Sequence, residues 1–99
     1  MIKGFLFDLD GVFYISNRLI DGANQTLYWL KNNNLAYKFI TNTTTLSREK
    51  ITQKLKTLGL DIDKNDIISA NYAGYLYLKK TKPSSCKLIL KDEAKDDYR

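Results

Sequence analysis

Two acidic residues at the end of an apolar run are the first feature of this sequence that suggests chemistry. Asp8 and Asp10 follow the run KGFLF, and Gly11 comes directly after them. Two carboxylates this close repel each other, and a hard cation such as Mg²⁺ compensates them by binding one or two carboxylates together with phosphate oxygens. One carboxylate can attack phosphorus to form an aspartyl-phosphate, while the other protonates the leaving oxygen and then activates water. The alternative is a solvated turn without chemistry, for which Gly11 supplies the tight backbone.

A hydroxyl and an amide stand at the end of a second apolar run. Thr41 closes the run AYKFIT, Asn42 follows it, and Ser47 is suited to be the N-cap of the next helix. In open α/β sheets the ligand crevice lies outside the carboxyl ends of the strands, so we expect Thr41 and Asn42 to face Asp8 and Asp10 across one crevice. A helix N-terminus nearby favours an anion such as phosphate. Taken alone, Thr-Asn before a helix is an ordinary cap. Only its combination with the two carboxylates predicts a phosphate site.

Strand and helix patterns alternate along the chain. We expect strands at residues 3–7, 36–41, 66–70 and 87–90. We expect helices at residues 23–32, between Ser47 and Gly59, at residues 71–80, and among the charged last nine residues. A short extended flap is expected at residues 12–15. This alternation predicts an α/β fold in which helices pack against a parallel sheet.

Composition limits the classes of function. The 99 residues suit one small domain or part of a larger one, and the net charge of +5 comes from scattered lysines, which favours a solvated surface over a nucleic-acid interface. The chain has no histidine and one cysteine, Cys86, which excludes Ser-His and Cys-His catalysis and an internal disulfide. We expect Cys86 to be a small core residue of a cytoplasmic protein. No apolar run is long enough to cross a bilayer, so no membrane partner is expected.

The two site motifs resemble those of a known family. FLFDLDGVFY is similar to the first signature of the haloacid dehalogenase superfamily, and FITNTTTLSREK is similar to the second. The stretch LKTLGLDIDKNDIISA resembles the branch that contains p-nitrophenyl phosphatases, phosphoglycolate phosphatases and NagD-like enzymes. The resemblance implies an incomplete Rossmann-like core over residues 1–70 and the start of a C2-type cap over residues 71–99.

The resemblance also implies a role for each matched position. Asp8 corresponds to the nucleophile and a Mg²⁺ ligand, and Asp10 to the general acid/base, whose backbone carbonyl is a further metal ligand. Thr41 corresponds to the residue that binds the transferring phosphoryl group, while Asn42 and the backbone around Gly11 line the phosphate pocket. The implied function is a Mg²⁺-dependent phosphoric monoester hydrolase for a small phosphorylated metabolite.

In the branch that the sequence resembles, two parts of the catalytic set follow the cap, and the resemblance places them beyond residue 99. They are a lysine that steadies phosphate and nucleophile, and an acidic pair that completes the metal site. The tail offers a cluster of acidic residues that is either a compressed metal site or a solvated face, namely Asp92, Glu93, Asp96 and Asp97. The alternative function is a truncated, non-catalytic remnant or interaction module that needs a second polypeptide. Such a chain would bind a partner, or a second copy of itself as a homo-oligomer, through the exposed edge of its sheet.

Overall fold

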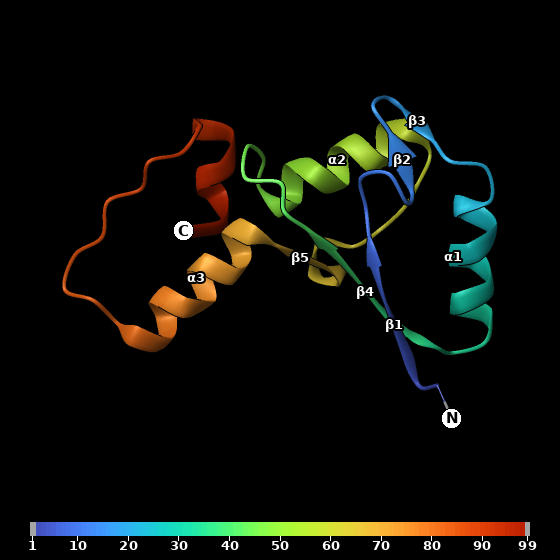
Figure 1. The fold of residues 1–99 in the computed structure, drawn as a ribbon, viewed down its shortest axis with the longest axis horizontal. Coiled ribbons are helices and arrows are strands. Elements are labelled where there is room, and N and C mark those ends of the chain that lie inside the picture. The colour runs from blue at the N-terminus through green and yellow to red at the C-terminus, as the bar shows by residue number, and fades with distance from the viewer. Residues whose placement is uncertain (1, 99) are drawn as a thin grey trace.

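The structure, a computed structural model, describes residues 2–98 and is built around a three-stranded parallel sheet (Figure 1). In pairing order the strands are β1 (Gly4–Asp8), β4 (Ala36–Thr41) and β5 (Ile67–Ser69). A small antiparallel hairpin follows β1 and consists of β2 (Tyr14–Ile15) and β3 (Arg18–Leu19). The α-helices are α1 (Ala23–Asn32), α2 (Arg48–Leu58) and α3 (Ala70–Thr81), and the 3-10 helices are η1 (Lys64–Asp66) and η2 (Asp92–Tyr98). The predicted α/β organisation is therefore confirmed.

Local sequence explains where α2 begins and ends. The Ser47 hydroxyl accepts a hydrogen bond from the backbone N–H of Lys50 at 3.2 Å, which satisfies one of the free donors of the first turn. Gly59 follows the last turn with a φ of 101°, the left-handed conformation that glycine adopts without steric cost. Between these ends, Ile51 and Leu55 are buried on one face of the helix.

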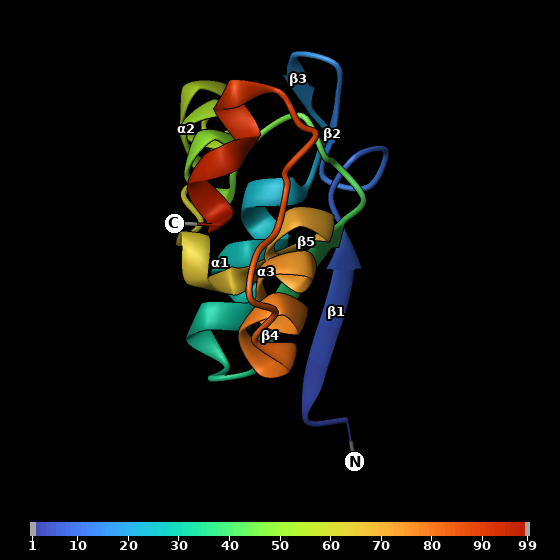
Figure 2. The same ribbon diagram turned by 90° about the vertical axis from the view of Figure 1, so that its left-hand side faces the viewer.

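One face of the sheet packs against α1 and α2. Leu27 of α1 and Leu55 of α2 belong to one buried cluster together with Phe39 of β4 and Ile67 of β5. Figure 2 shows both helices on the same side of β1. The Cα atoms span 45 × 34 × 17 Å, and the short dimension is that of a sheet with one layer of helices. The core therefore lies between the sheet and this single layer.

The other face of the sheet exposes apolar side chains. Leu6 of β1, Ile40 of β4 and Ile68 of β5 are 68%, 42% and 38% exposed. Ile40 and Ile68 are direct partners in the register of β4 and β5. Parallel sheets are almost always covered on both faces, so this face has the character of a surface that packs against further protein.

The C-terminal third differs from the sequence-based expectation in three ways. The predicted strand at residues 66–70 is shorter, because its first residue belongs to η1 and its last begins α3. The predicted strand at residues 87–90 is wrong. This segment has no regular structure, and Ile89 is 87% exposed, since no strand among residues 2–98 offers it backbone partners. Cys86, expected in the core, is exposed on the same segment.

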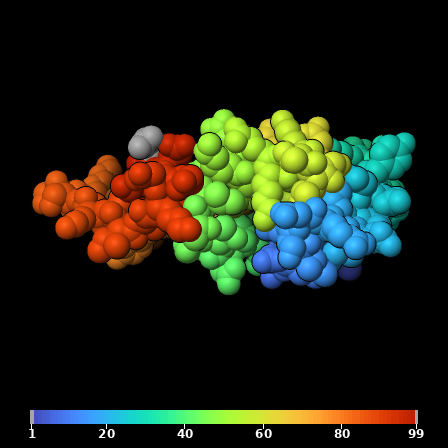
Figure 3. Space-filling model, turned by 90° about the horizontal axis from the view of Figure 1, so that it is seen from above, coloured from blue at the N-terminus to red at the C-terminus, as the bar shows by residue number. Residues whose placement is uncertain are grey.

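The charged tail does form a helix, as expected, but it is the 3-10 helix η2. It returns to α2 and α3 instead of extending away from them, and its buried residue is Ala94. Figure 3 shows the red C-terminal residues against the green residues around position 45. None of the helices within residues 2–98 combines the length and apolarity needed to cross a membrane.

Candidate active site

The turn after β1 presents Asp8 and Asp10 to solvent. Leu9 lies between them and is fully buried, and its carbonyl accepts the backbone N–H groups of Val12 and Phe13 at 3.2 and 2.9 Å. Successive residues of an extended chain point to opposite sides, so a buried Leu9 leaves both neighbouring carboxylates on the exposed side. Both Asp8 and Asp10 are exposed.

Gly11 makes this turn possible. Its φ is 82°, in the left-handed region that residues with a Cβ atom rarely adopt, and its N–H donates to the Tyr14 carbonyl at 2.8 Å. The N–H of Val12 is likewise used within the turn. The contribution of Gly11 to the site is therefore the path of the backbone, which turns directly after Asp10 so that Tyr14 comes back to pair with Asp10.

The ends of β1 and β4 bring Asp8 and Thr41 to one hollow. Asp8 is opposite Ile40 in the strand register, one residue before Thr41. Asp8, Thr41 and Asn42 line a hollow of about 440 Å³ together with residues of β5 and the start of α3. Asp10 and Gly11 are not among its lining residues. The structure thus places Asp8, Thr41 and Asn42 together as expected, with Asp10 and Gly11 on the turn beside them.

Hydrogen bonds fix two of these side chains. One carboxylate oxygen of Asp8, Oδ1, accepts the backbone N–H of Leu9 at 2.8 Å. Thr41 is buried, and its hydroxyl donates to the Thr43 hydroxyl at 3.0 Å and accepts the Thr43 N–H at 3.3 Å. These bonds orient Asp8 and Thr41 and leave Oδ2 of Asp8 with no protein partner among residues 2–98.

The two carboxylates share a region of negative potential. Burial raises the pKa of the Tyr14 phenol, and the charges of Asp10 and Asp8 raise it further. Neither carboxylate takes part in the ion pairs found within residues 2–98. A bound cation would relieve the repulsion between the two carboxylates.

This donor set suits Mg²⁺ better than a metal held by protein alone. No group of three or more acidic, histidine or cysteine residues able to hold a metal occurs within residues 2–98. Mg²⁺ commonly binds one or two carboxylates and keeps waters or phosphate oxygens for its other positions. The Asp8 carboxylate and an oxygen of Asp10 match that pattern.

A comparison with known families identifies the fold and its motifs. The model of a family described as haloacid dehalogenase-like hydrolase matches residues 5–99. The chain belongs to this family. The match includes both motifs that carry Asp8, Asp10 and Thr41, which confirms the resemblance inferred from the sequence.

Relatives within the family are phosphatases by name. The chain is 33% identical over 88 residues to an acid sugar phosphatase of Staphylococcus haemolyticus, covering 89% of this chain and 34% of that protein. It is 38% identical over 79 residues to phosphoglycolate phosphatase 2 of Arabidopsis thaliana, covering 79% and 26%. The solved 4-nitrophenylphosphatase of Thermotoga maritima superposes with a TM-score of 0.86 at 25% identity, covering 98% and 38%. The chain thus spans about a third of the length of these members of the haloacid dehalogenase-like family.

The start of α2 was expected to favour a phosphate, but its first backbone donor is already occupied. Its first backbone donor, the N–H of Arg48, already binds both carboxylate oxygens of Asp97, at 3.1 and 3.0 Å. The tail acids likewise form no metal site within residues 2–98, because Asp97 pairs with Arg48 and Asp92 with Lys95. Sequence reasoning missed the link between Arg48 and Asp97, since the two residues are 49 positions apart and no local pattern joins them.

Proposed function

We propose that this chain carries the phosphoryl-transfer motifs of a Mg²⁺-dependent phosphatase that acts on a small phosphorylated metabolite. The observation that carries the proposal is the shared hollow at the ends of β1 and β4, where Asp8 faces the same space as Thr41 and Asn42. The ligand crevice of open α/β sheets lies at this edge. The names of the relatives, which are acid sugar phosphatase, phosphoglycolate phosphatase and 4-nitrophenylphosphatase, support a phosphoric monoester as the substrate class.

Two carboxylates divide the chemistry. Oδ2 of Asp8 attacks phosphorus, the bond between phosphorus and the leaving oxygen breaks, and the Asp10 carboxyl gives that oxygen its proton. Water then attacks the phosphorus of the aspartyl-phosphate, Asp10 takes a proton from this water, and the bond from phosphorus to Asp8 breaks. Inorganic phosphate leaves, and both carboxyl groups return to their starting protonation states.

The remaining residues hold the phosphoryl group and the metal. The Thr41 hydroxyl, which donates to the Thr43 hydroxyl in this structure, would turn its one proton to a phosphoryl oxygen when phosphate binds, and Asn42 lines the phosphate pocket. The turn at Gly11 keeps Asp10 within reach of the leaving oxygen. The Asp8 carboxylate and the Asp10 backbone carbonyl would hold Mg²⁺, which offsets the negative charge of carboxylate and phosphate.

The same proposal extends to domain organisation and location. Residues 1–70 would be the N-terminal part of the catalytic core and residues 71–99 the beginning of the cap region. An exposed thiol without a disulfide partner, Cys86, fits the reducing cytoplasm. The family's later lysine and acidic pair would come from polypeptide that completes the fold.

The test is phosphate release from p-nitrophenyl phosphate, with Mg²⁺ and with excess EDTA, by this chain together with the polypeptide that completes the fold. The variant Asp8→Asn keeps the shape of the side chain and removes the nucleophile, so Mg²⁺-dependent release should disappear. Asp21→Asn makes the same chemical change in an exposed turn away from the hollow and should release phosphate at the unmodified rate. Undiminished turnover by Asp8→Asn would refute the assignment of the nucleophile.

A second candidate function is an interaction module without activity of its own. The observation that favours it is the exposed apolar face of Leu6, Ile40 and Ile68 together with the free edges of β1 and β5. A sheet with one uncovered face and two open edges binds further polypeptide readily. The partner would be the polypeptide that completes the family's fold or a second copy of this chain.

A further inference from the structure

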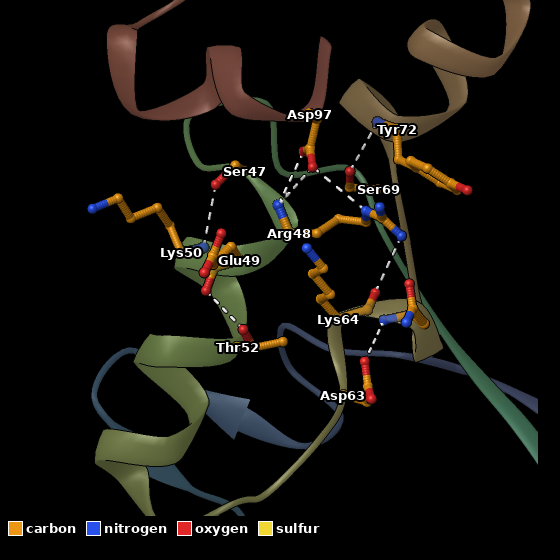
Figure 4. A network of polar contacts seen from close by, with 11 residues as sticks. Ser47, Arg48, Glu49, Lys50, Thr52, Asp63, Lys64, Ser69, Tyr72 and Asp97 are labelled. Carbon is orange, nitrogen blue, oxygen red and sulfur yellow. Dashed lines mark hydrogen bonds and ion pairs between the residues drawn. The ribbon is translucent and has the colours of Figure 1, made fainter. Parts of the chain in front are cut away.

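The C-terminal helix η2 binds the N-terminus of α2 through one carboxylate. Both oxygens of Asp97 accept the backbone N–H of Arg48, at 3.1 and 3.0 Å, and Oδ1 also lies 3.4 Å from the Arg48 Nε (Figure 4). The two side chains are only 14% and 5% exposed. A carboxylate at this position accepts a hydrogen bond from a free backbone donor of the helix. Its negative charge also interacts favourably with the positive end of the helix dipole.

The Arg48 side chain continues this contact into two other elements. Its guanidinium carbon lies 3.5 Å from the centroid of the Tyr72 ring in α3, and its Nη1 donates to the Lys64 carbonyl in η1 at 3.3 Å. Figure 4 shows the guanidinium between Asp97, Tyr72 and Lys64. Arg48 therefore links η2, α3, η1 and α2 at one point.

The loop at residues 42–47, which joins the end of β4 to α2, is held by the same neighbours. Its first part is bonded to Thr41 through Thr43. In its middle, the Thr44 carbonyl accepts the side-chain amide of buried Asn71 at 3.1 Å. At its end, the N–H of buried Ser47 donates to the Glu93 carbonyl of η2 at 2.9 Å. A loop without regular structure thus has a fixed contact near each end and one in its middle.

We propose that the Arg48–Asp97 pair is a clamp that positions the loop at residues 42–47, and with it the Thr41 hydroxyl and Asn42, for phosphate binding. The proposal rests on the proposed function, because it assigns positioning residues to the same site. Breaking one partner of a buried charge pair is costly, since the other charge stays buried without compensation. Loss of the clamp therefore frees the start of α2 and the end of the loop together.

The experiment compares Asp97→Asn with Asp92→Asn. Both variants remove one negative charge from η2, but Asp92 is exposed and, within residues 2–98, forms its ion pair with Lys95 of the same helix. Amide hydrogen exchange is followed at residues 42–48, and the affinity for inorganic phosphate is measured with and without Mg²⁺. We expect Asp97→Asn to speed exchange and to weaken phosphate binding, each about tenfold, as for the loss of a charged helix cap. We expect Asp92→Asn to change neither quantity.

Three results would overturn the clamp: unchanged exchange in Asp97→Asn, faster exchange with unchanged phosphate affinity, or equal effects of the two variants. If circular dichroism shows that Asp97→Asn is unfolded, Arg48→Lys replaces it, because lysine keeps the backbone bond to Asp97 and loses the guanidinium contacts. The same outcomes then decide. A wild-type chain that binds no phosphate with Mg²⁺ would contradict the proposed function. In that case the hydrogen-exchange rates of the variants at residues 42–48 would still support or refute the clamp on the loop.

Discussion

Replacing Gly11 by alanine should destabilise the turn that carries Asp10 through backbone strain alone. Gly11 has a φ of 82°, and a Cβ atom added there would meet no atom within 4 Å. The cost is therefore that of the left-handed conformation, about 1–2 kcal/mol for a residue with a Cβ atom. In a domain of this size, each kcal/mol lowers Tm by about 4–8 °C.

Gly59→Ala is the matched control for this prediction. Gly59 has a φ of 101°, and its added Cβ would make only an ordinary contact of 3.8 Å with Leu19, away from the hollow that holds Asp8. Thermal unfolding followed by circular dichroism should give a similar loss of stability for both variants. Only Gly11→Ala should also reduce Mg²⁺-dependent phosphate release. The reasoning fails if Gly11→Ala is as stable as the unmodified chain, or if both variants reduce phosphate release equally.

Two further predictions concern the open face and Tyr14. Sedimentation velocity should show that the chain self-associates, and Leu6→Lys on the open face should make it monomeric. Tyr28→Lys, at an equally exposed site on α1, should leave the self-association unchanged. A monomeric unmodified chain would argue against self-association through this face. Burial, and after it the charges of Asp10 and Asp8, raise the pKa of the Tyr14 phenol above its ordinary value of 10.0. The neutral phenol therefore stabilises the folded state fully below about pH 10. This stabilisation is lost as the pH rises through the pKa that Tyr14 has in the folded state. Urea unfolding at increasing alkaline pH should therefore show a smaller loss of stability for Tyr14→Phe than for the unmodified chain. An identical loss in the two proteins would mean that Tyr14 is not the source of the loss.

Local patterns were sufficient for most elements of the fold. The strands β1 and β4 are each determined by a contiguous run of mostly apolar residues. The helices α1 and α2 are each determined by apolar residues at helical spacing, and α2 also has a cap residue at each end, Ser47 and Gly59. The meeting of Asp8 with Thr41 was also predictable, because the carboxyl ends of adjacent parallel strands form one edge. The catalytic roles of these residues remain predictions.

Features that depend on distant partners were not predictable from local sequence. Residues 87–90 have the composition of a strand, but a strand forms only beside another, and residues 2–98 provide none there. Asp97 looked like part of an acidic surface or metal site, whereas its carboxylate caps α2 from 49 residues away. The same contact explains why the start of α2 is not a free anion site. Each of these errors concerns a pairing that the sequence pattern does not encode.

Trapping the covalent intermediate tests the central claim most directly. The chain, together with the polypeptide that completes the fold, would be incubated with Mg²⁺ and p-nitrophenyl phosphate, quenched in acid, and digested so that mass spectrometry locates any phosphoryl group. The account predicts a phosphoryl group on Asp8 that is absent with EDTA and absent in Asp8→Asn. Phosphate release accompanied by a phosphoryl group on another residue, or by an adduct that forms equally without Mg²⁺, would contradict it.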